Sequence, residues 1–214
     1  MSHQIYRLTV TAPPEVEPLA LNEVKAYLRV DHDDDDDLIA GLIVAAREAC
    51  ETATGRSLIT RGYSLYMDAW PGTTALGWWD GIEEGADILY KDSALFLPQP
   101  PLVSVSAIRV YNADNSYAVL PPGGYAVDAI GMPGRVILSD GALPPVPGRV
   151  VNGIEVQFTA GYGAQREKVP AALRQGMRQV VAYLYENRGD TPGRAVLSSG
   201  AAALFHPFRS VGMS

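Results

Sequence analysis

The strongest constraint on the fold is a regular helical pattern near the C-terminal end of the 214-residue chain. Five apolar side chains recur at i, i+4, i+7, i+8 and i+11, on one face of a helix: Leu173, Met177, Val180, Val181 and Leu184. Pro170 is favourable in the first turn of such a helix, where no amide donor is needed. The pattern predicts a long amphipathic helix within residues 166–188, and this helix needs other helices to cover its apolar face.

Residues 1–60 predict those other helices, preceded by an extended N-terminal arm. Asn22 is a suitable N-cap for a short helix over Glu23–Leu28. A second helix begins at the aspartate run Asp33–Asp37 and ends at Gly55, because glycine commonly terminates helices. Its expected apolar stripe consists of Leu38, Leu42, Ala45, Ala46 and Ala49, widened by Ile39 and Ile43.

Residues 61–165 change character and predict a β insertion between the helices. Apolar and polar residues alternate in short runs, as in Tyr63–Met67 and Ile154–Phe158. Turn signals rich in proline and glycine separate these runs. We expect about six to eight short, mainly antiparallel strands in a small barrel or sandwich. Residues 71–86 are expected to form an exposed hairpin tip.

Residues 189–214 predict an extended C-terminal arm that begins with a flexible, glycine-containing stretch. Its candidate partner-binding residues are Leu204, Phe205, Pro207, Phe208 and Arg209. An apolar segment on a flexible tether suits an arm that becomes ordered when it binds another protein. The alternative is that the segment folds back onto its own domain and covers the apolar stripe of the helix within residues 166–188.

Together these patterns predict an α+β fold, in which a small helical bundle carries an inserted, mainly antiparallel β domain and an extended C-terminal arm. Hydrophobic residues make up 47% of the chain, enough for a substantial core. Charged residues make up only 19%, which leaves less charge to cover a free surface and favours an oligomer. No apolar run approaches the roughly 20 residues that span a bilayer, so we expect no membrane contact and a soluble protein.

Charge and motifs argue against an enzyme and against a protein that wraps nucleic acid. The net charge of −7 has the wrong sign for neutralising phosphates. The run Asp33–Asp37 lacks the spacing of a calcium loop, and acidic residues at a helix start also complement the helix dipole. His3, His32 and His206 show no metal-ligand spacing. We expect no catalytic residue, metal or cofactor; a small metal-dependent hydrolase that uses the aspartate run is the remaining enzyme alternative.

Several segments occur along the chain in a distinctive order. The first is LALNEVKAYLRVD, followed after further aspartates by DLIAGLIVAAREACETATGRSLIT. Next come IEVQFTAGYG at residues 154–163, then VPAALRQGMRQVVAYLYENRGD, and finally LFHPFRS. In this order the segments resemble the head–tail connector proteins of tailed phages, also called adaptor or head-completion proteins, and their counterparts in gene transfer agents.

The resemblance implies a structural head–tail connector that is neither an enzyme nor dependent on a cofactor. Such proteins form a ring, commonly of twelve subunits, under the portal vertex of the capsid and extend the DNA channel toward the tail. The implied partners are the portal protein, a tail-side stopper or tail terminator protein, and other copies of the chain. DNA passes through the channel without sequence-specific binding.

The implied location is the head–tail junction of a virion or phage-like particle, assembled in the bacterial cytoplasm. An acidic channel wall would agree with this role, because it repels DNA and lets it slide. The alternative within the same class is another ring-forming virion component, such as a stopper or tail terminator. That kind of protein should lack the leading two-helix pattern.

Overall fold

The computed structural model describes residues 6–70, 90–91, 94–139 and 145–210. The chain divides into two compact units, and it passes between them three times. The helical unit comprises mainly residues 14–60 and 161–212, and the β unit comprises mainly residues 1–13 and 61–160. The exposed hairpin tip predicted for residues 71–86 lies outside the described residues. None of the described helices combines the length and apolarity that a membrane span requires.

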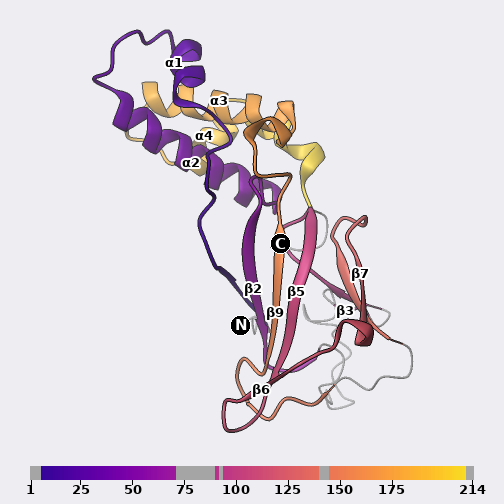
Figure 1. Ribbon diagram of the computed structural model, residues 1–214. Coiled ribbons are helices and arrows are strands. Elements are labelled where there is room, and N and C mark those ends of the chain that lie inside the picture. Colours follow the sequence, from indigo (N-terminus) through magenta and orange to yellow (C-terminus); the bar gives the residue numbers. More distant parts are fainter. Residues whose placement is uncertain (1–5, 71–89, 92–93, 140–144, 211–214) are drawn as a thin grey trace, which may run out of the picture. The chain divides into compact units, whose positions relative to one another are not determined.

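Five α-helices build the helical unit (Figure 1): α1 (Leu21–Leu28), α2 (Asp36–Thr54), α3 (Ala171–Glu186), α4 (Pro192–Ser198) and α5 (Ala201–Phe205). Short 3₁₀ helices cover Arg166–Lys168 and His206–Phe208. All five apolar residues of the predicted stripe on α3 are buried, which confirms that helix and its buried face. Gly55 ends α2 in the left-handed conformation, as predicted.

The buried face of α2 differs from the predicted stripe by about one residue. Its centre is formed by Ile39, Ile43, Ala46 and Cys50, all of which are buried in one core with the stripe of α3. Leu38 and Leu42 are only half-buried. Both sets of residues are apolar, so the sequence pattern defines a wide face without defining its centre.

Two antiparallel sheets build the β unit. The first has the order β1 (Tyr6–Val10), β2 (Arg61–Met67), β9 (Ile154–Ala160), β5 (Leu102–Tyr111) and β6 (Tyr117–Val119). The second has the order β3 (Tyr90–Lys91), β4 (Ala94–Phe96), β8 (Arg135–Leu138) and β7 (Tyr125–Asp128). Leu95 and Val136 of the second sheet share a core with Leu65 and Phe158 of the first. The two sheets therefore form a sandwich, one of the two predicted arrangements.

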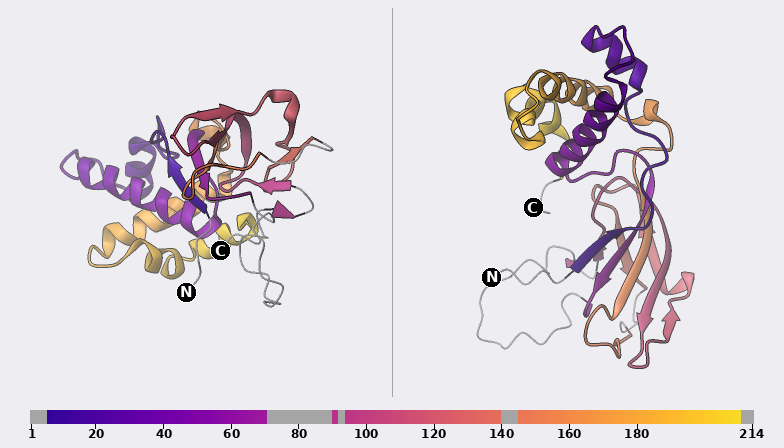
Figure 2. Two further views of the ribbon diagram at one scale, coloured as in Figure 1. Left: turned by 90° about the horizontal axis from the view of Figure 1, so that it is seen from below. Right: turned by 90° about the vertical axis from the view of Figure 1, so that its left-hand side faces the viewer.

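Strand β1 gives the N-terminal segment a different role from the predicted arm. Tyr6–Val10 pairs with β2 over its whole length, from Tyr6 opposite Met67 to Val10 opposite Tyr63. Figure 2 shows this strand along the edge of the first sheet. The β unit is therefore built from the N-terminal strand together with the segment that begins at β2.

Candidate partner-binding site

The C-terminal segment was the predicted partner-binding arm, and its described residues are helical rather than extended. Helices α4 and α5 and the turn His206–Phe208 pack on the helical unit, with α4 and α5 against α3 (Figures 1 and 2). Phe205 is only 1% exposed. A Cβ atom added to Gly176 would lie 2.4 Å from Cε1 of this ring, so the missing side chain makes room for it. The prediction of an extended arm is therefore wrong for residues 192–208. These residues instead fold back onto their own unit, as the alternative prediction stated.

Hydrogen bonds hold the end of this segment near the C-terminal end of α2. The Arg56 guanidinium donates a hydrogen bond to the carbonyl oxygen of Phe208. It also donates to the Tyr162 hydroxyl at 3.3 Å. The amide of Ser210 donates to the carbonyl oxygen of Thr54 at 2.8 Å. The segment is therefore anchored at both the Phe205 ring and the backbone that follows it.

The five predicted partner-binding residues differ in accessibility. Phe205 is buried, and Leu204 and Phe208 are half-buried against the helical core. Only Pro207 and Arg209 are exposed. In this conformation these two residues are the ones that another protein can reach directly.

The aspartate run links three helices instead of capping one. Nζ of Lys25 on α1 lies 2.6 Å from a carboxylate oxygen of both Asp33 and Asp36. The Tyr185 hydroxyl on α3 donates to Asp35. Asp35 occupies the N-cap position of α2, but its side chain makes no capping hydrogen bond because it accepts from Tyr185 instead. The helix-start location is thus as predicted, while the capping contact is not.

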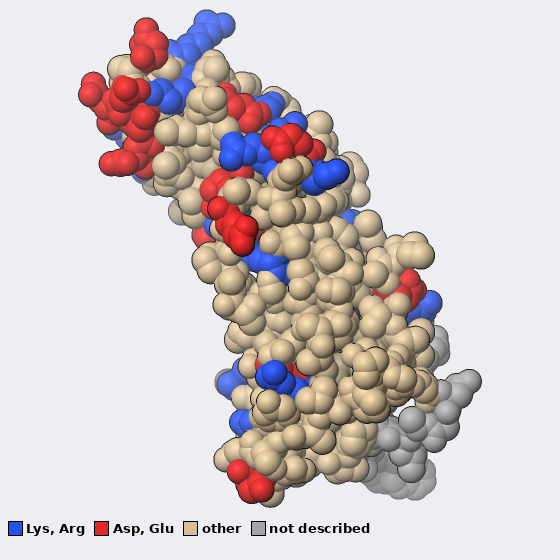
Figure 3. All heavy atoms as spheres, in the orientation of Figure 1, with Lys and Arg blue, Asp and Glu red and all other residues tan. Residues whose placement is uncertain are grey.

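The Lys25 contacts also affect the titration of the run. The hydrogen bond from Lys25, followed by its charge, lowers the pKa of the Asp33 carboxyl below its ordinary value. Figure 3 shows acidic side chains gathered at the end of the helical unit where α1 connects to α2. Among the described residues, no three His, Cys, Asp or Glu side chains are placed to hold a metal ion.

A second charged site, on the outer face of the first sheet, escaped the sequence analysis. Glu155 of β9 is 2% exposed. Five side chains donate to its carboxylate: Tyr111 at 2.7 Å, Gln157 at 2.8 Å, Ser64 at 3.0 Å, Tyr66 at 3.1 Å and Arg109 at 3.3 Å. Burial alone would raise the pKa of Glu155, but these hydrogen bonds outweigh burial and hold the pKa below its ordinary value.

The arrangement around Glu155 favours structure over chemistry. A carboxylate that accepts five hydrogen bonds has little remaining capacity to bind a metal or to remove a proton. Burial, then the hydrogen bond and charge of Glu155, raise the pKa of Tyr111, so this phenol stays protonated. The only signal in the sequence is a charged residue within the strand pattern IEVQFTA, and such a residue is ordinarily solvent-exposed.

Comparison with known proteins defines the class to which the fold corresponds. Residues 19–76 match the profile of the phage gp6-like head–tail connector protein family, and this range contains α1 and α2. No curated protein matches the chain.

Solved structures narrow the comparison to gene transfer agent (GTA) particles. The neck of an empty GTA particle with C6 symmetry contains a similar chain, with a TM-score of 0.73, 25% identity and 96% of each chain covered. The virion of a native GTA particle gives a TM-score of 0.73, 27% identity and 95% coverage of each chain. The neck of a native GTA particle with C12 symmetry gives 0.70, 26% and 96%.

These matches confirm the resemblance to head–tail connectors, in sequence over α1 and α2 and in fold over nearly the whole chain. They support a structural connector role in the virion. The proteins compared are structural virion components rather than enzymes.

Proposed function

We propose that this protein is a structural head–tail connector that forms a ring in the neck of a phage-like particle and joins the capsid to the tail. The observation that carries the proposal is the likeness to GTA neck chains over 96% of both chains. Similarity over a full chain extends to both units, so it covers more than a shared helical motif. The chain is expected in the finished particle, after assembly in the bacterial cytoplasm.

The proposed ring contains twelve copies of the chain and lies under the portal. A stopper or tail terminator protein would follow it on the tail side. Support comes from the C12 symmetry of one similar neck and the C6 symmetry of another, because both are compatible with a ring of twelve. DNA would pass through the ring without sequence-specific contacts, in agreement with the net charge of −7. We expect the protein to have no enzyme activity.

The alternatives have weaker support. A stopper or tail terminator should lack the leading helix pair, whereas α1 and α2 are present and match the connector family. A metal-dependent hydrolase based on Asp33–Asp37 would need carboxylates free to bind an ion. Asp33 and Asp36 instead contact Lys25, and Asp35 accepts from Tyr185.

The C-terminal segment remains the proposed portal-binding element, with Pro207 and Arg209 as its accessible contacts. Arg209 would form a charge-assisted hydrogen bond with a portal carboxylate or carbonyl group. Leu204 and Phe208 would add half-exposed apolar surface. Engagement of Phe205 would require its ring to leave the space above Gly176, which burial in the helical core opposes.

The proposed function is tested by deleting the gene in the producing cell and examining particles by electron microscopy. We expect DNA-filled heads without attached tails, restored by the wild-type gene. Normal tailed particles without this protein would contradict the connector role. An averaged neck map with one or two copies at this position would contradict the ring.

The portal contact is tested separately with Arg209→Glu, using Lys168→Glu, at an exposed cation outside the C-terminal segment, as the matched control. We expect Arg209→Glu to leave the protein folded but to reduce its amount in particles. Equal incorporation of the two variants would refute the C-terminal site without affecting the connector role.

A further inference from the structure

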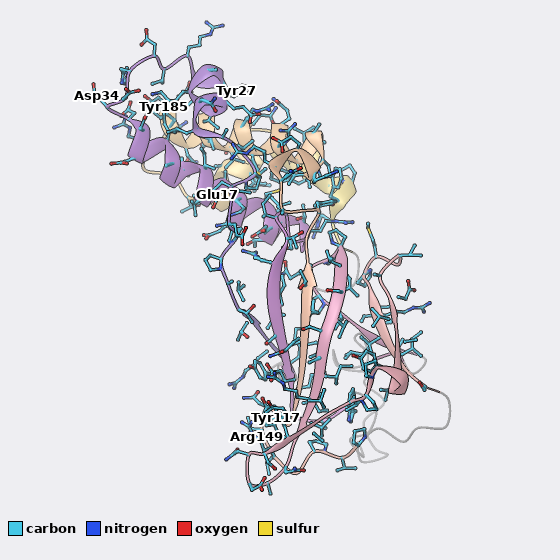
Figure 4. The ribbon with its side chains drawn as sticks, viewed as in Figure 1. Glu17, Tyr27, Asp34, Tyr117, Arg149 and Tyr185 are labelled. Atoms are coloured by element: carbon cyan, nitrogen blue, oxygen red, sulfur yellow. The ribbon has the colours of Figure 1, made fainter. Side chains whose placement is uncertain are left out.

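The first sheet of the β unit ends in two edge strands, β1 on one side and β6 on the other. Among the described residues, no strand pairs with the outer side of either one. All three residues of β6 are exposed, Tyr117 at 49% and Val119 at 54%. Figure 4 shows Tyr117 next to Arg149. An open edge presents unpaired peptide groups, so another strand can add to it.

Strand β6 also lacks the features that usually keep an edge strand from pairing. Natural proteins protect such edges with charged residues, prolines or bulges. The second sheet follows this rule, because its edge strands β3 and β7 carry Lys91 and Asp128. Strand β6 has the uncharged sequence YAV and pairs with β5 without a register shift. Its outer edge is therefore suited to pairing with a further strand.

The alternation of hydrogen bonds identifies the peptide groups that β1 has available. The Thr11 amide donates to the carbonyl oxygen of Gly62 at 3.0 Å, directly after the last residue of β1. In an antiparallel pair, successive residues point their peptide groups alternately toward the partner strand and away from it. The register therefore directs the peptide groups of Tyr6, Leu8 and Val10 away from β2.

The same alternation identifies the available groups of β6. The Leu120 amide donates to the carbonyl oxygen of Ile108 at 2.8 Å, directly after the last residue of β6. The peptide groups of Ala118 are therefore directed toward β5, and those of Tyr117 and Val119 are directed away from it. The available groups on this edge thus flank Ala118 on both sides.

Strand direction determines how two copies of the chain can join these edges. Every neighbouring pair in the five-stranded first sheet is antiparallel, so β1 and β6 run in the same direction. A head-to-tail contact that continues the sheet from one copy to the next preserves strand direction and sheet face. It therefore makes β6 of one copy parallel to β1 of the next.

The available peptide groups fit a parallel pair in which Leu8 lies opposite Ala118. In parallel pairing, a residue bonds to the two residues that flank the one opposite it. The Leu8 amide would donate to the carbonyl oxygen of Tyr117, and the Leu8 carbonyl oxygen would accept from the Val119 amide. Leu8 and Ala118 both lie opposite core residues of their own sheet, so their side chains share a face. Antiparallel pairing would place Leu8 opposite Tyr117 or Val119 and turn the sheet over at each contact.

We propose that β1 of one copy pairs in parallel with β6 of the next, so that the first sheets join into a continuous belt around the ring. The pairing places Arg7 beside the Tyr117 ring, which favours a cation–π contact, and Thr9 beside Val119. The proposal rests on the proposed ring function and names the surfaces through which the ring closes.

A second copy of the chain is favoured over a different protein because it satisfies both edges at once. A strand from another protein would cover β1 or β6 and leave the other edge open. Two-fold pairing of like edges has the same shortcoming, and it closes a dimer rather than a ring. Three paired residues give weak binding, so the belt depends on contacts that act together around the closed ring.

The first test is Val119→Pro in the full chain, examined in the particles that the producing cell releases. The Val119 amide points away from β5, so proline removes the donor that the neighbouring copy needs without removing a hydrogen bond of the sheet. Val127→Pro on edge strand β7 is the matched control. The Ser139 amide donates to the carbonyl oxygen of Gly124, and this register directs the Val127 amide away from β8.

Both proline variants are expected to keep the circular dichroism spectrum of the wild type. The amount of Val119→Pro in particles should fall by about tenfold or more, because the contact is lost at every position of the ring. The amount of Val127→Pro should stay close to that of the wild type. Equal incorporation of the two folded variants would overturn the proposal.

A second test decides the question even where the proline variant does not fold. Thr9→Cys and Val119→Cys are combined in one chain, and purified particles are treated with a short thiol-specific cross-linker. Cys50 is fully buried and does not compete for the reagent. The double variant should give a ladder of covalent oligomers on a denaturing gel, whereas each single variant and the combination Thr9→Cys with Val127→Cys should remain monomeric.

The other outcomes separate this proposal from the connector role. Particles that contain the double variant but give no ladder would refute the edge pairing and leave the connector role intact. Covalent dimers in a single variant would show a two-fold contact in place of the head-to-tail one. Absence of the wild-type protein from particles would refute the connector role, and the pairing with it.

Discussion

The connection between α1 and α2 and the outer face of the first sheet both carry carboxylate charge, but they differ in the number of carboxylates and in their surroundings. The connection carries six aspartates within Asp31–Asp37, and the Asp33 and Asp34 side chains are 90% and 96% exposed. The sheet face carries the single carboxylate of Glu155, which is 2% exposed and accepts from five side chains. The first region contains many carboxylates that are mostly exposed to water. The second contains one buried carboxylate that accepts hydrogen bonds from five protein side chains.

The difference teaches that stability depends on how a charge is solvated rather than on how many charges are present. Exposed ion pairs contribute little because water competes for both partners. A buried carboxylate with all its hydrogen bonds satisfied becomes costly to disturb, because removing it leaves its donors unpaired. We therefore expect the longer acidic run to matter less for folding than the one residue that is inconspicuous in the sequence.

The largest expected effect comes from Glu155→Ala. Removing one member of a buried ion pair costs about 3–5 kcal/mol, and the 28% exposure of the Arg109 side chain puts the expected loss near the lower end. Urea unfolding followed by circular dichroism measures the change. The exposed Glu167→Ala is the control, with a change of less than about 0.5 kcal/mol. Equal losses in the two variants would show that the buried Glu155 carboxylate contributes no more to stability than an exposed carboxylate does.

A smaller loss is expected from Tyr111→Phe, which removes the shortest of the five hydrogen bonds to Glu155. A hydrogen bond to a charged group contributes about 1.5–3 kcal/mol, and the carboxylate retains four other donors in this variant. Tyr125→Phe is a matched control in the same unit. The comparison is sharpened by a double-mutant cycle with Glu155→Gln, in which additive losses would show that the two residues do not interact.

Acid should weaken the β unit gradually through Glu155. The folded-state pKa of Glu155 lies below its ordinary value of 4.5, so its contribution is fully present above about pH 4.5 and is lost as the pH falls toward the folded-state pKa. Protonation leaves the side chain in place, so this effect is smaller than that of its removal. Urea midpoints between about pH 6 and pH 3 should converge for wild type and Glu155→Gln, and parallel curves would contradict the prediction.

The smallest effects are expected in the aspartate run. Asp34→Ala should change the melting temperature by less than about 2 °C, because its side chain is almost fully exposed. Lys25→Met should lower it slightly, and this loss should become smaller at about 1 M salt, where the screening length falls to about 3 Å. The loss in Glu155→Ala should persist at the same salt concentration. If a chelator lowered the melting temperature and one specific cation restored it, the aspartate run would have to be reconsidered as a metal site.

Patterns among residues that are close together in the sequence predicted the features that depend on those residues alone. The stripe from Leu173 to Leu184 has an uninterrupted helical period, so α3 and its buried face follow from it directly. Short alternating runs separated by turns indicated a small barrel or a sandwich, without deciding between them. The apolar character of residues 204–209 indicated that this segment packs on a protein surface, but it did not decide between a partner and the segment's own unit.

Long-range complementarity accounts for what the sequence patterns missed. The place of Phe205 depends on the absence of a side chain at Gly176, and the two residues lie on different helices. The donors to Glu155 come from β2, β5 and β9, so only strand register reveals them. The close approach of Gly148 to the β5–β6 turn likewise depends on a missing side chain, because a Cβ atom there would lie 2.6 Å from the backbone nitrogen of Ala113.

The edge strand β1 has a consequence for the order in which the chain can fold during synthesis. Tyr6 emerges from the ribosome early, but its partner Met67 follows only after both α1 and α2 have been made. Met67 in turn pairs with Ile154 of β9, while the stripe that completes the helical core begins only at Leu173. The β unit can close once β9 has been made, whereas the helical core must wait for α3, so nascent chains that stop before β9 expose both unfinished cores.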